Sequence, residues 1–252
     1  VKILKTFNTE ENLNGNLSLA TSGHRRLYNT NSEETVLINN LLFESNPTIQ
    51  KNGLNSSYSF LLKNVNSDAE KSTKYRNSRS YKLLTAFMLE SSFPLKKERE
   101  GFNSFLTPKI SMRYSPNPTK NISSNDLKLN VNNIFALERI GTNDSIEGGQ
   151  SLTIGNEYRR TNKNNEEQFL INLATVYRDK ANVDLPVTST MRDTHSDIVG
   201  NIKISPNNFL NFDYNFSLDN NLNTINYNSI NTSLAVNNFV TTFEFMEENN
   251  LI

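Results

Sequence analysis

A period of two residues runs through most of this chain and limits what it can fold into. In the stretch NNFLNFDYNFSLDNN, apolar residues stand at every second position from Leu210 to Leu218, and Asn, Asp or Ser fills the positions between them. Successive side chains of a β-strand point to opposite faces. The stretch therefore predicts a strand with one apolar face and one strongly polar face.

The same alternation recurs along the chain. It is clear in SLTIGNEYR, EQFLINLATVYRD, SDIVGNIKIS and NNFVTTFEFMEE, and it is noisier in ETVLINNLLFES, GLNSSYSFLLKNVN, SRSYKLLTAFMLESS and FLTPKISMRYSP, where some apolar residues occupy both faces. We expect roughly eleven or twelve strands of about ten residues each, joined by polar turns and longer hydrophilic loops. The longest clear loop of the second half runs from Ala181 to Asp197.

Composition and charge exclude several classes of protein. Only 35% of the residues are hydrophobic, which argues against an ordinary core buried on both faces of its sheets. Lys plus Arg equals Asp plus Glu at 26 each, so no overall field attracts nucleic acid, and we expect no nucleic-acid partner. Without cysteine there is neither a disulfide nor a thiolate metal site. No apolar run approaches the roughly 18 residues of a membrane-spanning helix, but a membrane β-barrel stays open.

Alternating segments of about ten residues are the sequence signature of an antiparallel transmembrane β-barrel. A soluble β-sandwich, a solenoid or a large sheet also alternates. Tyr114, Tyr158 and Tyr177 fall near the ends of expected strands, where a barrel carries interfacial aromatic residues. We therefore predict an all-β fold, either a transmembrane barrel or an open barrel segment of roughly 11–12 strands.

In such a barrel the two faces of each strand meet different solvents. The apolar face contacts lipid, and the polar face lines a wet lumen. The candidates for the lipid face are Leu152, Ile154, Leu210, Phe212 and Phe216. The candidates for the lumen are Glu157, Arg159, Asn211, Asp213 and Asn215.

Catalytic and metal-binding signatures are weak. His24 and His195 belong to no HExxH or HxxEH spacing, so both are interpreted as loop or rim residues and not as metal ligands. The sequence also has no GxSxG, no GxxxxGK[ST] and no GxGxxG that opens a helix. We predict no enzyme and no cofactor.

One cluster of charges could still carry chemistry. Glu138, Arg139, Asp144 and Glu147 stand close together among glycines. Two carboxylates and an arginine could serve glycoside hydrolysis, and acidic residues in a glycine-rich loop could bind calcium, although the spacing matches no EF-hand. The alternative is a connection in which Arg139 pairs with Asp144 or Glu147 inside a wet lumen. Three glycines would allow its tight backbone geometry, namely Gly141, Gly148 and Gly149.

Residues 132–159, NNIFALERIGTNDSIEGGQSLTIGNEYR, resemble the barrel region of the LptD or OstA family of lipopolysaccharide-assembly proteins. The family pattern N-x-F-x-x-x-R-x-x-G-x-D-x-x-E-x-G precedes a strand with T-x-G-x-x-Y, and this chain has one extra residue between its Gly and Asp. The segment FLTPKISMRYSPN and the hairpins after Ser196 are also similar, so the resemblance extends from about Phe105 onward. The matching positions are Asn132 or Asn133, Phe135, Arg139, Gly141, Asp144, Glu147, Gly149, Thr153, Gly155 and Tyr158.

The resemblance implies a location in the cell outer membrane and a role in transport. A family member takes lipopolysaccharide from periplasmic bridge proteins and inserts it into the outer leaflet, with no covalent step. Its implied partners are lipopolysaccharide, outer-membrane lipid, the bridge proteins and an LptE-like plug lipoprotein inside the barrel. The family's cysteines, signal peptide and periplasmic N-terminal domain do not occur in this sequence. We therefore expect residues 1–252 to form a single, partial barrel domain.

Two other functions share parts of the pattern. A different outer-membrane barrel, such as a porin or an uptake receptor, would alternate in the same way but lack the motif from Arg139 to Tyr158. A soluble β-rich carbohydrate-binding protein or glycosidase would bury both faces of its strands.

Overall fold

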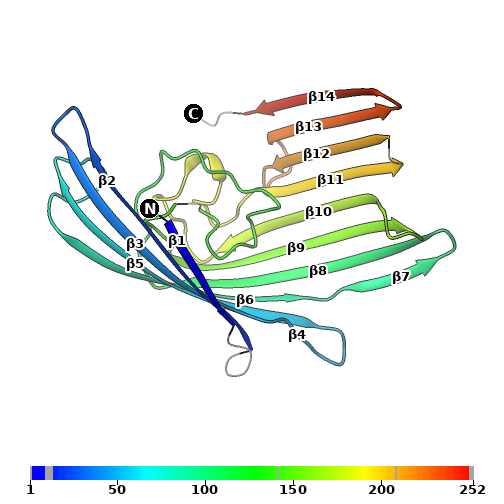
Figure 1. Cartoon of the computed structure of the whole chain (residues 1–252). Coiled ribbons are helices and arrows are strands. Elements are labelled where there is room, and N and C mark those ends of the chain that lie inside the picture. The colour runs from blue at the N-terminus through cyan, green and yellow to red at the C-terminus, as the bar shows by residue number, and fades with distance from the viewer. Residues whose placement is uncertain (1, 9–13, 141, 208, 250–252) are drawn as a thin grey trace.

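The chain folds into one curved antiparallel sheet, which the computed structural model describes for residues 2–8, 14–140, 142–207 and 209–249 (Figure 1). Across these residues the sheet has 14 strands, and the only helix is the short 3-10 helix η1 (Val187–Ser189). The strands are β1 (Lys2–Asn8), β2 (Gly15–Leu27), β3 (Glu33–Ser45), β4 (Thr48–Ile49), β5 (Asn55–Glu70), β6 (Ser80–Ser92), β7 (Leu95–Arg99), β8 (Phe102–Ser115), β9 (Gly149–Asn162), β10 (Glu167–Arg178), β11 (Ile198–Asn207), β12 (Leu210–Leu218), β13 (Ile225–Val236) and β14 (Phe239–Glu248).

The strands follow one another around the sheet almost in chain order. Twelve strands form a continuous antiparallel path from β1 to β14, while β4 pairs only with β5 and β7 only with β8. Within the described residues β1 and β14 are edge strands, so the sheet is open. The predicted all-β class and the open barrel segment are confirmed. In the described part of the chain, no helix has the length and apolar character needed to cross a membrane.

The pairing register sorts the side chains into two faces. Asn201 of β11 lies opposite Asn215 of β12, and Ile202 lies opposite Tyr214. Asn201 and every second residue from it along the strand, here called the concave parity, point into the hollow of the sheet. Val199 belongs to this set and packs there against residues of the loops. The other parity points outward to the convex face.

The convex face is rich in exposed apolar side chains. Phe87 lies opposite Tyr114, and Tyr177 lies opposite Leu152, so aromatic rings share one level across neighbouring strands. Tyr158 lies at another level of β9, about 27 Å along the strand from the residue that faces Tyr114, at roughly 3.4 Å per residue. On the convex face of β6, β8, β9 and β10, the exposed apolar residues include Leu83, Phe87, Leu89, Leu106, Ile110, Met112, Tyr114, Ile154, Leu173 and Tyr177.

Two long connections fold back into the hollow of the sheet. The first inner segment (116–140 and 142–148, between β8 and β9) and the second inner segment (179–197, between β10 and β11) are the green and yellow traces at the centre of Figure 1. Each provides apolar residues that pack on the concave face.

Packing of the inner segments creates two hydrophobic clusters. One joins both inner segments to β10 and β11, and the other joins the first inner segment to β3, β5 and β6. The first cluster consists of Ile122, Leu129, Ile134, Ile140, Ala174, Val176, Leu185, Met191 and Val199. The second consists of Val36, Ile38, Leu61, Val65, Leu84, Ala86, Leu137 and Ile146.

These clusters correct the expectation that the sheet has no two-sided core. Strands β3, β5 and β6 carry apolar residues on both faces, as the noisy alternation of their sequences indicated. The inward-facing apolar residues are covered by protein and not by water. A composition of 35% hydrophobic residues suffices because the core fills only part of the hollow.

The two faces of β12 should differ sharply in their tolerance of charge. Phe212→Arg places a cation on the convex face and should cost about 2–4 kcal/mol of folding free energy if that face meets the bilayer midplane. Asn211→Arg, one residue earlier on the concave face, should cost much less. Reversible unfolding of both variants in lipid vesicles measures the difference, and equal costs would contradict the assignment of the faces.

Candidate functional site

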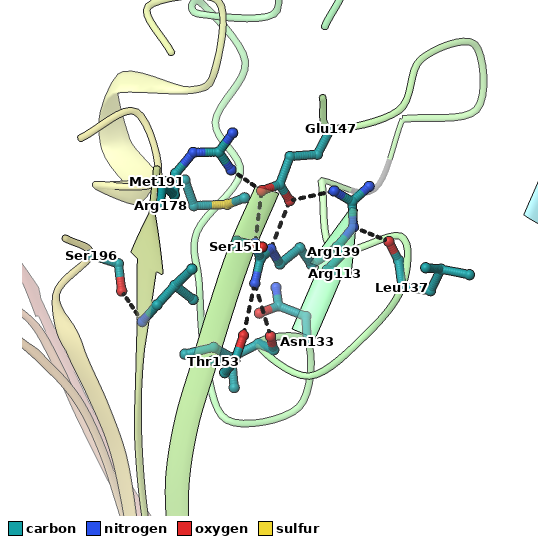
Figure 2. Close-up of polar contacts among 12 residues, drawn as sticks. Arg113, Asn133, Leu137, Arg139, Glu147, Ser151, Thr153, Arg178, Met191 and Ser196 are labelled. Carbon is teal, nitrogen blue, oxygen red and sulfur yellow. Dashed lines mark hydrogen bonds and ion pairs between the residues drawn. The ribbon is translucent and has the colours of Figure 1, made fainter. Parts of the chain in front are cut away.

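A buried carboxylate lies inside the hollow, at the end of the strands where the first inner segment joins β9. The Glu147 side chain is 1% exposed and accepts two hydrogen bonds of 2.7 Å from Arg139, one from Nε and one from Nη2 (Figure 2). Arg139 also donates to Ser151 Oγ at 2.7 Å and to Thr153 Oγ1 at 3.1 Å. This two-pronged ion pair ties the inner segment to the concave face of β9, because a planar guanidinium matches the two oxygens of a carboxylate.

Two further arginines reach the same carboxylate from the sheet. Arg178, the last residue of β10, donates from Nη1 to Glu147 and from Nη2 to the Gly148 carbonyl at 2.7 Å. Arg113 of β8 has Nη1 at 4.0 Å from the Glu147 carboxylate, and its Nε donates to the Leu137 carbonyl at 2.9 Å. One carboxylate therefore connects β8, β9 and β10 with the first inner segment.

The arginines also set the protonation of Glu147. Burial by itself raises the pKa of this carboxyl, but the charges of Arg139 and Arg113 and the hydrogen bond from Arg139 outweigh burial and lower the pKa to about 2. Glu147 is therefore ionised at neutral pH. With no exposed oxygen, it cannot act as a general acid on a substrate.

A second ion pair, between a buried lysine and an exposed carboxylate, anchors the same segment to β5. Lys63 of β5 is 1% exposed and donates from Nζ to Glu138. It also donates to the Ser145 carbonyl at 3.2 Å. Since a buried ammonium without a partner is costly, this pairing fixes the position of the segment against β5.

Asp144 forms the third polar contact of the inner segment. Its Oδ2 accepts from Tyr75 Oη at 2.8 Å and from Lys120 Nζ at 2.7 Å, and Lys74 Nζ lies at 3.4 Å. Burial raises the pKa of Asp144, but the hydrogen bonds from Lys120 and Tyr75 and the lysine charges lower it to about 2. Burial and the bond to Asp144 raise the pKa of the Tyr75 hydroxyl.

Two glycines of the motif allow close contacts. Gly149 has a φ of 87°, a conformation that other residues rarely adopt, and it turns the chain from the inner segment into β9. At Gly155, an added Cβ would lie 2.8 Å from the ring of Phe135, so the glycine makes room for that ring on the inner face. Lys109 Nζ lies 4.4 Å from the centroid of the same ring, in a cation–π contact.

Only some of the motif residues predicted from the sequence lie together in the structure. Phe135, Arg139 and Glu147 lie inside the hollow, whereas Tyr158 lies on the convex face beside Phe169, with ring centroids 6.0 Å apart. Gly141 lies outside the described residues. Of the two partners proposed for Arg139, the structure selects Glu147, and Asp144 binds Lys120 and Tyr75 instead.

The prediction that Arg139 pairs in a wet lumen is wrong, because its side chain is 1% exposed. The first inner segment covers it. Sequence reasoning missed Arg113, Arg178 and Lys63, whose only local signal is a cation on the inward parity of a strand. The partners of these three residues lie 24 to 82 residues away in the chain.

The predicted lumen residues lie on the concave parity. Asn201 donates to Asp213 Oδ1 at 2.7 Å and to Asn215 Oδ1 at 2.8 Å, which makes a polar ladder across β11 and β12. Arg159 Nε lies 3.9 Å from the Glu157 carboxylate. Asn211 shares this parity and accepts from Ser205 at 2.8 Å.

The predicted lipid-facing residues lie on the convex parity. Ile154 is exposed, and Leu152 lies beside Tyr177. Phe216 covers Gly200 on the neighbouring strand, where an added Cβ would lie 2.2 Å from its ring. Leu210 and Phe212 share this parity on β12. Contact with lipid itself stays a prediction.

His24 lies within β2, three residues before its end, and not in a loop. His195 lies in the second inner segment, with its ring 5.0 Å from that of Tyr177 and its Nδ1 3.0 Å from Thr194 Oγ1. The described residues contain no group of three or more His, Asp or Glu that could hold a metal ion.

Removing the charge of Glu147 should loosen the whole arrangement. Glu147→Gln leaves the buried arginines without a counter-charge and should lower the free energy of unfolding by about 3–5 kcal/mol. Denaturant unfolding of the refolded protein in detergent measures this loss. The matched control is Glu98→Gln on β7, whose exposed ion pair with Lys96 should contribute little to stability. Similar losses in the two variants would contradict the central role of Glu147.

Acid should have a related effect. Glu147 and Asp144 have folded-state pKa values of about 2, below the ordinary values of 4.5 and 3.8. Their contribution is fully present above the ordinary pKa and is lost as the pH falls toward 2. The denaturant concentration at the unfolding midpoint of the wild type should therefore decrease as the pH is lowered from about 4.5 to 2. The Glu147→Gln variant should show a smaller decrease. An unchanged midpoint across this interval would show that the two carboxylates are not held ionised.

Comparison with protein families identifies the chain. The model of the family LptD, described as LPS transport system D, matches residues 15–250. The comparison with curated proteins gave no match. The matched range includes the cluster around Glu147 and eleven of the twelve strands of the main path, from β2 to β14. The chain therefore belongs to the LptD family of outer-membrane proteins that take part in lipopolysaccharide transport.

Proposed function

We propose that this chain forms part of the wall of a β-barrel, and that this barrel inserts lipopolysaccharide into the outer leaflet of the cell outer membrane. The observation that carries the proposal is the family match over residues 15–250, together with a sheet that is apolar outside and polar within. Lipopolysaccharide combines acyl chains that favour hydrocarbon with a sugar-phosphate head that favours water. A wall with these two faces lets each part stay in its own solvent.

The dimensions of the strands support the spanning role. A transmembrane strand needs about 9–11 residues, and each strand of the main path from β2 to β14 has at least 9. We propose that residues 1–252 act as one barrel domain. Its two edge strands, β1 and β14, need further strands or a partner beside them, because lipid does not tolerate unpaired backbone groups.

The lengths of the connections suggest an orientation. The end of the sheet that carries the two inner segments also carries the connections 28–32 and 71–79, whereas the opposite end carries short turns such as 163–166 and 237–238. Outer-membrane barrels have short periplasmic turns and longer extracellular loops. We propose that the inner segments enter from the extracellular end and occupy the lumen while no substrate passes.

The hollow retains space beside the inner segments for part of a substrate. A cavity of about 440 Å³ lies between the two inner segments and β12 to β14, and its lining includes Asn215, Ser217, Asn226 and Tyr227. Amides, hydroxyls and an aromatic ring suit sugars. The further partners that we propose are an LptE-like plug lipoprotein, the periplasmic bridge proteins and outer-membrane lipid.

Two alternatives are less well supported. A porin or uptake receptor would share the alternation of the strands, but the family match favours lipopolysaccharide transport. A soluble carbohydrate-binding protein would expose the apolar convex face to water, at a cost in free energy for each exposed side chain. A glycosidase would need carboxylates that a substrate can reach, and the side chain of Glu147 is buried.

Arg139→Ala in the full-length protein should reduce lipopolysaccharide at the cell surface, because the inner segment loses its main contact with β9. Surface lipopolysaccharide is measured by antibody or lectin binding, and barrel assembly by heat-modifiable migration in gels. The control is Arg25→Ala, which removes an exposed arginine of β2 with the same change of charge and size.

Normal surface lipopolysaccharide in an Arg139→Ala strain would contradict the proposed role of the segment. A hydrolase activity that disappears in Glu147→Gln would contradict the transport proposal itself and favour an enzyme.

A further inference from the structure

A cavity of about 660 Å³ lies at the end of the hollow that carries the longer connections. Its walls come from β2, the connection 71–79 and the first inner segment. It is separate from the buried cluster around Glu147, which does not line it. The connections β2–β3 and β5–β6 that flank it are the blue and cyan loops at the left of Figure 1.

Cations dominate the charged groups of this cavity. Arg26, Lys74 and Lys120 line it, and Asp144 is the one carboxylate among its described lining residues. Lys120 and Lys74 both lie against Asp144. Arg26 has no ion pair within 4.0 Å in the part of the chain that the structure describes, so no carboxylate contacts it directly there.

The acidic residue nearest to this set in the sheet is already engaged. Glu34 lies opposite Arg26 in the pairing of β2 with β3, but its carboxylate accepts from Ser72 Oγ and, at 3.2 Å, from Tyr28 Oη. Glu34 is 5% exposed. It lowers the net positive charge of the region and leaves the face of the cavity cationic.

Two polar atoms on the wall lack partners. Nε2 of His24 and Oγ1 of Thr142 are covered from solvent and have no hydrogen-bond partner among the described residues. Both residues line the cavity. Buried polar groups are normally satisfied, so this pair beside Arg26 and the two lysines that share Asp144 points to a ligand with several acceptor oxygens.

We infer that this cavity binds a phosphate group. A phosphate monoester carries a charge of about −1.5 to −2 and three acceptor oxygens, so Arg26 and Lys74 can bind it together. A single carboxylate has two oxygens and one charge and would satisfy fewer of these donors. The inference rests on the proposed function for its source, because the sugar-phosphate head of lipopolysaccharide supplies such a group, and free inorganic phosphate is the other source.

The test uses the full-length protein purified in detergent. Binding is measured for three probes: lipid A that carries both phosphates, the same lipid A after removal of the phosphates, and inorganic phosphate. The variant is Arg26→Gln with Lys74→Gln, since both side chains are solvent-accessible and their loss leaves the core intact. The control is Lys97→Gln with Arg99→Gln on the exposed strand β7, at the opposite end of the sheet.

The double variant should bind phosphorylated lipid A at least about tenfold more weakly, because two charge-assisted contacts are lost. Its binding of dephosphorylated lipid A should stay unchanged, and the β7 control should match the wild type with every probe. Inorganic phosphate that binds the wild type, fails to bind the double variant and displaces no lipid A would identify free phosphate as the ligand.

The inference would be overturned if the double variant bound phosphorylated lipid A as tightly as the wild type does, and also bound inorganic phosphate as tightly as the wild type does. Equal weakening in the β7 control would also overturn it, because the effect would then follow net charge. Surface lipopolysaccharide in the Arg139→Ala strain tests transport separately. A protein that transports but shows no phosphate-dependent binding at this cavity would overturn only the present inference.

Discussion

The fold of this chain depends on one buried carboxylate shared among arginines. Glu147 forms ion pairs with Arg139 of its own segment and with Arg178 of β10, and Arg113 of β8 also lies close to its carboxylate. Each charge would be costly alone in a dry interior, so none can leave without stranding the others. The first inner segment is thereby fixed to three adjacent strands. The hydrophobic clusters pack the same segment onto the concave face.

That constraint explains how a chain with so few apolar residues sustains a core. The apolar residues of the hollow come from two sources, the inward parity of the strands and the inner segments, and neither source alone could bury its surface. Polar residues occupy the remaining concave surface, for example the ladder from Asn201 to Asp213 and Asn215. The hollow is therefore dry where the segments lie and polar where they do not.

Much of the fold could be predicted from the sequence, and less of the site. Alternation in β9, β11 and β12 separates residues such as Ile154 and Phe212 from Asp213, because the backbone pleat fixes this period locally. The motif also offered Asp144 and Glu147 as partners for Arg139, and the structure selects Glu147. The wet lumen was wrong, since alternation reports the face of a residue but not what covers that face. His24 was misplaced because β2 alternates weakly, with glycine and small polar residues around it.

The sequence by itself determined the two faces of the strands, the absence of a disulfide framework and the family of the chain. The tertiary structure decided which charges meet. Lys63 finds Glu138 across 75 residues of chain, and Arg178 finds Glu147 across 31. No local pattern encodes such contacts, because they exist only after the sheet has curved and the two inner segments have folded into its hollow. A period along one strand is a property of its backbone, whereas a shared counter-charge is a property of the path of the whole chain.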